Sequence, residues 1–173
     1  MVRFVSLAAG AVLLFAGSAF AQGAKLTDPQ IAHIAYTAGV VDIDAAQQAL
    51  KKSNNPQVKA FAQDMVRDHT SVNDQALALC KKLGVTPEDN DTSKSIAKQG
   101  KEERAKLASL SGAAFDKAYA ENEVKYHQMV NGALENTLIP GASNAELKSL
   151  LQTGLKIFKG HEEHAKALVA SLK

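Results

Sequence analysis

The segment from Pro56 to Gly84 reads PQVKAFAQDMVRDHTSVNDQALALCKKLG, and its apolar residues recur at alternating steps of three and four. That spacing places them on one face of an α-helix and is typical of the seam of a helical bundle. Pro at the first helical position and Gly at the end mark the bounds of the helix. The expected inward face holds Ala62, Met65, His69, Val72, Ala76, Leu79 and Leu83.

Three other segments show the same alternation, and we expect them to pack with the first. They run from 28 to 53, from 113 to 139, and from Ser143 onward, where Glu146 completes a capping box. Their inward faces hold Ile31, Ala35, Ala38, Asp42, Ala45 and Ala49; then Tyr119, Glu123, His127, Val130, Leu134 and Leu138; then Leu147, Leu151, Gly154, Phe158, His161, Ala165 and Leu168.

A shorter, charged helix is expected at about residues 93–110, after a loop over residues 85–92. Its apolar positions are few, so we interpret it as a connector that lies across the bundle. Short loops join the first two long helices and the last two, which makes each pair an antiparallel hairpin. The long link between the hairpins predicts an all-α, ferritin-like four-helix bundle with a crossover helix between the second and third core helices.

The first 21 residues have the pattern of a secretory signal peptide. A basic start precedes an apolar run over residues 4–16, and Ala19-Phe20-Ala21 fits a small-x-small cleavage site. We therefore expect residues 1–21 to be removed and residues 22–173 to form a single domain. The alternative is an uncleaved membrane anchor, for which the run is short. No later stretch is apolar enough to span a bilayer, so the expected location is the periplasm or the outer envelope.

The charge balance narrows the class of partner. Residues 1–21 carry one charge, that of Arg3, so their removal changes the formal net charge from +2 to +1. A near-neutral chain without a basic block is not expected to bind nucleic acid. An envelope protein or a membrane-surface contact stays open as a partner. Cys80 is the only cysteine, so it is either buried, which we favour, or linked to a second chain.

Each of the four long helices carries an ionisable residue on its inward face, where an apolar seam does not need one. From the rise of a helix, Asp42 and His69 lie about 18 and 20 Å from the first interhelical turn. Glu123 and His127 lie about 16 and 22 Å down the third helix, and His161 lies about 10–15 Å from the same end. We expect these five residues to share one layer.

Three imidazoles and two carboxylates in one layer favour a transition metal such as Zn, Cu, Fe or Mn over Ca or Mg. We therefore predict a metal site at Asp42, His69, Glu123, His127 and His161. His164, three residues after His161, could also converge on it. Asp68 points about 100° away from His69, so we expect it at the surface or in support of a ligand.

Two strings of sequence resemble the motifs of one bacterial family. They are NPQVKAFAQDMVRDHT at residues 55–70 and LSGAAFDKAY at residues 110–119, and His127 and His161 match two later histidines. The chain is similar throughout to the domain-of-unknown-function family 4142, exported proteins that are often labelled as outer membrane proteins. The resemblance implies a ferritin-like bundle in the cell envelope and no particular activity. In that family the position of Asp42 is commonly Glu. Asp has the shorter side chain, so whether Asp42 reaches a shared metal is open.

Three functions stay open from the sequence. The first is an exported protein with a mononuclear metal site, in which Glu123 is a fifth or alternate ligand. The second is a structural or stress-related module of the envelope, in which buried histidines form a polar network. The third is a redox enzyme. Di-iron chemistry is disfavoured, because Val66 and Phe158 stand where the Glu-x-x-His pairs of di-iron bundles place carboxylates.

Overall fold

The computed structural model describes residues 25–172, and all of the regular structure in this range is helical. The prediction of an all-helical bundle is confirmed. The predicted signal peptide, residues 1–21, lies outside the described residues. The elements are α1 (Asp28–Lys52), α2 (Pro56–Lys82), α3 (Asp91–Ala108), α4 (Gly112–Ala133), the π-helix η1 (Leu134–Leu138), α5 (Ile139–Gly141) and α6 (Ala145–Ser171).

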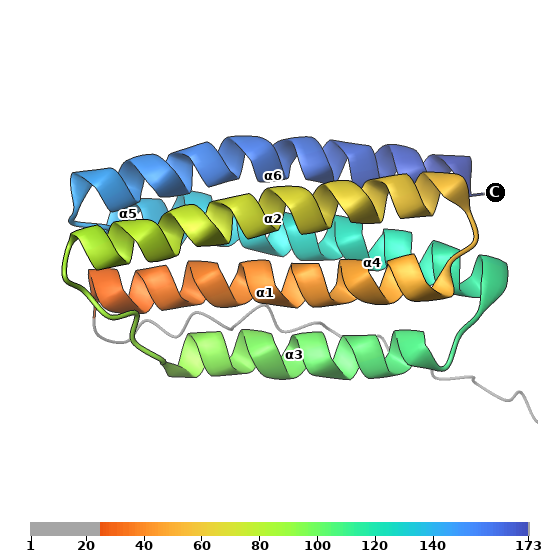
Figure 1. Cartoon of the computed structure of the whole chain (residues 1–173), viewed down its shortest axis with the longest axis horizontal. Coiled ribbons are helices and arrows are strands. Elements are labelled where there is room, and N and C mark those ends of the chain that lie inside the picture. The colour runs from red at the N-terminus through yellow and green to blue at the C-terminus, as the bar shows by residue number, and fades with distance from the viewer. Residues whose placement is uncertain (1–24, 173) are drawn as a thin grey trace, which may run out of the picture.

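The long helices lie side by side (Figure 1). Two hydrophobic clusters, one at each end of the bundle, show in which direction each helix runs. One cluster joins the end of α1 to the starts of α2 and α4 and to the end of α6, through Ala49, Phe61, Phe115 and Leu168. The other joins the start of α1 to the ends of α2 and η1 and to the start of α6. Helices α2 and α4 therefore run parallel. Helix α3, which joins them in the chain, runs back along α1.

Side-chain caps set the starts of the long helices. Thr27 forms a capping box with Gln30 at α1, and Asn55 accepts hydrogen bonds from two backbone amides at α2. Helix α6 starts at Ala145, and its cap is Asn144 rather than the predicted Ser143. The side-chain oxygen of Asn144 accepts hydrogen bonds from the backbone N–H groups of Glu146 and Leu147. A helix that starts at Ala145 therefore has both of these free N–H groups satisfied.

The periodicity predicts that the helix that begins as α4 continues as a regular α-helix up to Pro140, but it does not. It widens into the π-helix η1 over Leu134–Leu138 and then continues as the short helix α5. Pro140 lacks an N–H, and its ring crowds the carbonyl four residues earlier. A π-turn is one of the few ways in which a helix can absorb that conflict and keep Leu134 and Leu138 in the core.

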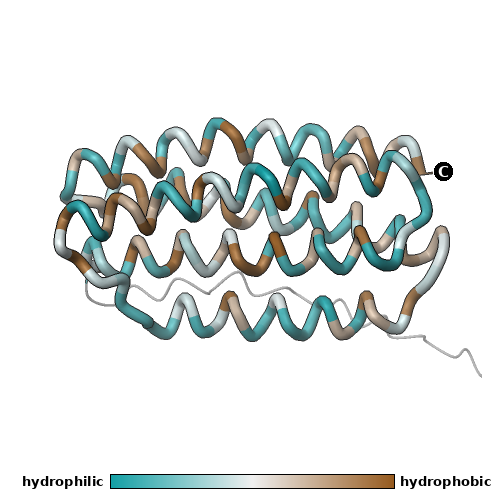
Figure 2. The backbone as a smooth tube through the Cα atoms, viewed as in Figure 1, coloured by the Kyte–Doolittle hydropathy of each residue, from teal (hydrophilic) through white to brown (hydrophobic). Residues whose placement is uncertain are grey.

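Figure 2 shows that apolar residues recur among polar ones along the long helices. Most of the residues buried in the bundle are apolar. The predicted inward position Leu83 is an exception, because it is 36% exposed. It follows the last residue of α2 and so lies beyond the packed part of the bundle. Among the described residues, no helix is both long and apolar enough to cross a membrane.

Candidate metal centre

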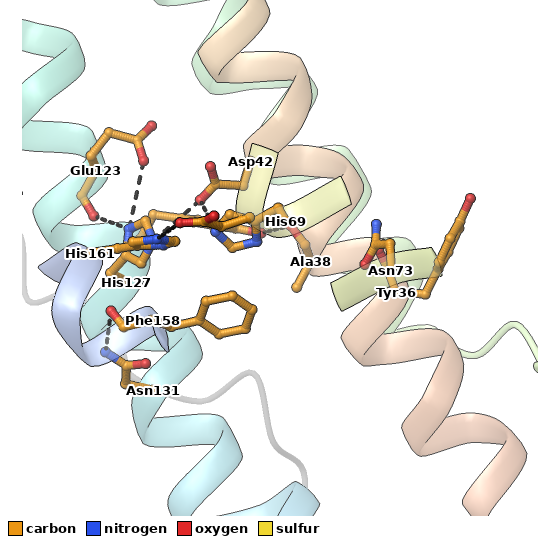
Figure 3. Close-up of polar contacts among 12 residues, drawn as sticks. Tyr36, Ala38, Asp42, His69, Asn73, Glu123, His127, Asn131, Phe158 and His161 are labelled. Atoms are coloured by element: carbon orange, nitrogen blue, oxygen red, sulfur yellow. Dashed lines mark hydrogen bonds and ion pairs between the residues drawn. The ribbon is translucent and has the colours of Figure 1, made fainter. Parts of the chain in front are cut away.

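Five ionisable side chains meet in the middle of the bundle, and they are the five that the sequence singles out (Figure 3). Asp42 comes from α1, His69 from α2, Glu123 and His127 from α4, and His161 from α6. Each is at most 7% exposed. The helices therefore hold three imidazoles and two carboxylates in a dry environment, where an isolated charge is strongly unfavourable.

The three imidazoles form a triangle at the core. Their ring centroids are 5.3 to 5.7 Å apart, and one nitrogen from each ring lies within 4.8 Å of the others. Phe158 stacks on the ring of His69 at a centroid distance of 4.4 Å and an interplanar angle of 6°. This stacked ring closes one side of the triangle and restricts the orientation of His69.

Hydrogen bonds determine which nitrogen of two rings can face the centre. The Nδ1 of His127 lies 2.9 Å from the carbonyl oxygen of Glu123, so Nδ1–H donates and Nε2 keeps its lone pair. The Nε2 of His161 lies 3.0 Å from Oδ2 of Asp68, so Nε2–H donates and Nδ1 keeps its lone pair. An imidazole anchored on one side by a carbonyl or carboxylate is the usual arrangement of a metal-binding histidine.

Asp42 lies between two of the imidazoles. Its Oδ2 is 3.4 Å from Nε2 of His69 and 3.6 Å from Nε2 of His127, without the geometry of a hydrogen bond. Ligand atoms around a tetrahedral ion, with bonds of about 2.0–2.1 Å, lie about 3.3 Å apart. The side chain of Asp42 therefore reaches the imidazoles despite being one carbon shorter than Glu.

Glu123 occupies a different position. Its Oε2 lies 3.6 Å from Nδ1 of His127, on the side of the ring that is already bonded to the main chain. Asp42, Glu123 and His127 form a second group whose ligand atoms lie within 4.8 Å of one another. The two groups of potential ligands share His127.

Burial sets the protonation of the metal-free cluster. It raises the pKa of Asp42 to about 8, and burial followed by the charge of Asp42 holds the pKa of Glu123 well above its usual range. Burial is also the main cause that lowers the pKa of all three histidines, to about 4 for His127. At neutral pH the imidazoles are neutral, which is the form that binds metal.

Many polar atoms of this layer have no hydrogen-bond partner within residues 25–172. They include both nitrogens of His69, both carboxylate oxygens of Asp42, Nε2 of His127 and Nδ1 of His161. Buried polar atoms in proteins are nearly always satisfied, and each one left unpaired is destabilising by about 1–3 kcal/mol. The layer thus gathers in one place several buried polar atoms that have no protein partners in the described part of the chain.

Three residues near the cluster lie where the sequence pattern does not place them or gives no signal for them. Asp68 does contact a histidine of the cluster, but that histidine is His161 on α6 rather than the adjacent His69. His164 does not join the cluster; it is exposed, and its ring packs edge-on against Phe61. Asn131, which donates to Glu162 beside the cluster, carries no periodic signal that would single it out.

The fold and the cluster together define a helical-bundle protein with a candidate metal centre at its core. The chain belongs to the family described as "Domain of unknown function (DUF4142)", which matches residues 15–168. The resemblance inferred from the two sequence motifs is thereby confirmed. No curated protein matches the chain.

One solved structure is similar in fold, described as "CopM in the Cu(II)-bound form". It superposes with a TM-score of 0.63 at 19% sequence identity, and the match covers 84% of this chain and 98% of that one. At this identity the likeness supports a shared bundle architecture. The CopM structure carries Cu(II).

Proposed function

We propose that this protein is an exported helical-bundle protein of the cell envelope that binds one transition metal ion in its core. The ligands are His69 through Nε2, His127 through Nε2, His161 through Nδ1, and the carboxylate of Asp42. Glu123 is available as an additional or alternate ligand. The signal-like start of the chain supports export, and the buried cluster supports the binding of metal.

One observation carries the proposal: His69 is 3% exposed and neither of its ring nitrogens has a hydrogen-bond partner. A polar network that only fixed helix register would satisfy such an atom, because an unsatisfied network is less favourable than an apolar core. Here one nitrogen of each of the three imidazoles lies within 4.8 Å of the other two, and Oδ2 of Asp42 lies 3.4 and 3.6 Å from Nε2 of His69 and of His127. A cation would satisfy them all, which favours metal binding over the purely structural alternative.

The donor set limits the metal. Three nitrogens and one oxygen suit Cu, Zn, Fe or Mn and disfavour Ca and Mg, which prefer oxygen ligands. Copper is the first ion to test, because the structural neighbour is a Cu(II) form and because divalent copper binds such sites most tightly. Two carboxylates are too few for the bridged di-iron centre of other bundles.

The test is elemental analysis of the mature chain, residues 22–173, purified without a His tag. Wild-type protein should hold close to one equivalent of transition metal after loading and desalting. Replacing His69 and His161 together by Ala should abolish binding while the helical circular dichroism persists. The matched control replaces His33 and His164, which lie outside the cluster, and should bind as the wild type does. Unchanged metal content in the His69/His161 variant would exclude this site.

A further inference from the structure

A groove of about 640 Å³ runs between α1, α3 and α4, and Asp42 and Glu123 are among the residues that line it. The groove exists because α3 packs along α1 and contacts α4 only at a few positions. Val41 meets Gly100 at the α1–α3 contact, so closely that a Cβ at position 100 would lie 2.4 Å from it. This contact holds α3 to one side of α4.

The inner end of the groove presents unpaired acceptor atoms. Both oxygens of Asp42 and Oε2 of Glu123 lack hydrogen-bond partners among the described residues, and both residues are only 1% exposed. Figure 3 shows the two carboxylates on one side of the imidazoles, with Phe158 on the other. The groove therefore approaches the imidazoles from the side that is opposite to Phe158.

From this arrangement we infer that the groove between α3 and α4 admits the metal ion, and that Glu123 and Asp42 capture it before it passes to the three imidazoles. The inference rests on the proposed function. It explains why Glu123 approaches the Nδ1 side of His127 while Asp42 approaches Nε2. Asp42 and His127 would belong to both positions, and His69 and His161 would replace Glu123 as ligands when the ion passed from the first to the second.

A second cavity reaches the same centre but is a poor path for an ion. Tyr126 lines this cavity too, and Asp42, His69 and His127 lie in its lining, but most of the other lining residues are apolar, such as Ile34, Val72 and Leu151. Along the apolar part of this path a hydrated cation would lose its water before it met a ligand, which is strongly unfavourable. In the groove, carboxylate oxygens replace the lost water at the inner end. Charges at the mouth have both signs, and Lys106 there is paired with Glu103.

The test is the rate of Cu(II) loading into metal-free protein, followed by stopped-flow quenching of tyrosine emission. The chain has three tyrosines and no tryptophan, and Tyr126 lines both cavities. Ala118→Leu narrows the groove and should slow loading at least tenfold while the final metal content stays at that of the wild type. Ala35→Leu narrows the apolar cavity and should leave the rate unchanged.

Glu123→Gln is the second variant, and it keeps the size and hydrogen-bonding capacity of an uncharged carboxyl group. It should also slow loading at least tenfold, whereas Glu121→Gln, at an exposed neighbour in the same groove, should not. Wild-type rates in both Ala118→Leu and Glu123→Gln, or slowing by Ala35→Leu alone, would overturn the proposed route. A wild-type protein that takes up no metal would instead overturn the proposed function itself.

Discussion

His161 donates a hydrogen bond from Nε2 to Oδ2 of Asp68 at 3.0 Å, across the interface between α6 and α2. Asp68 is itself held by Arg67, whose guanidinium lowers the pKa of that carboxyl group. The imidazole is therefore fixed with Nδ1 toward the core by a charge that stays ionised. Its orientation is determined by a residue at the edge of the bundle.

Asp68→Asn should weaken metal binding by 10- to 100-fold, the usual effect of removing a carboxylate that orients a ligand. An amide can rotate its NH₂ toward His161 and allow the wrong tautomer. A competition titration against a chromophoric chelator measures the change. The matched control is Asp64→Asn, because Asp64 also binds Arg67 but does not contact His161. Equal losses in both variants would assign the effect to Arg67 instead.

The metal-free protein should lose stability as the pH rises from 6.5 to 8. Asp42 has a folded pKa of about 8 against an ordinary value of 3.8, so the folded state holds an extra proton between these values. That contribution is complete below pH 3.8 and disappears as the pH passes through about 8. The histidines, whose folded pKa values are lowered, act only below about pH 6.5.

Through Asp42 alone, urea denaturation of the metal-free protein should therefore show a free energy of unfolding about 1–2 kcal/mol lower at pH 8 than at pH 6.5, and the raised pKa of Glu123 acts in the same direction. Asp42→Asn cannot ionise and should reduce this slope. Bound metal should reverse it, because the ion requires the ionised carboxylate. A wild-type profile that is flat over this range would contradict the raised pKa of Asp42.

Phe158→Ala should destabilise the protein by about 3–5 kcal/mol, the range for removing a buried aromatic ring. Phe158 is 8% exposed and stacks on His69, so its loss also leaves that imidazole free to turn. Chemical denaturation measures the loss. The control is Leu83→Ala at the exposed end of α2, which should change stability by less than about 0.5 kcal/mol.

Gly100→Ala should be destabilising by about 1–3 kcal/mol, because the added methyl group would overlap Val41. The double variant with Val41→Ala makes room for that methyl group and should recover part of the loss. A thermodynamic cycle over the four proteins gives the coupling between the positions. Strict additivity would mean that α3 and α1 are not in this close contact.

The sequence predicts the layer of five ionisable residues because helical spacing is local. Asp42, His69 and His161 each lie on an apolar stripe, and the rise of a helix is constant enough to place them at one depth. The same logic fails where two helices meet. Whether Asp68 reaches His69 or His161 depends on how α2 and α6 are rotated against each other, which no local pattern encodes.

The sequence pattern also gives no sign of two local features, the π-helix before Pro140 and the outward position of His164. The periodicity of the fourth helix continues through Leu134 and Leu138, so it gives no sign that the backbone widens there to accommodate Pro140. His161 and His164 are equally compatible with one helix face, yet only the first turns inward. Phe61 already fills the space beside His164, so the core has no room for a fourth imidazole.

The donors are divided between two hairpins, with Asp42 and His69 on α1–α2 and the other three on α4–α6. Each hairpin closes through short-range contacts and can form early in folding, while its polar side chains are still in water. Only the docking of one hairpin on the other removes that water. The centre is thus complete only after the two hairpins have docked, and an ion that binds residues of both hairpins would favour this docking rather than the helices themselves.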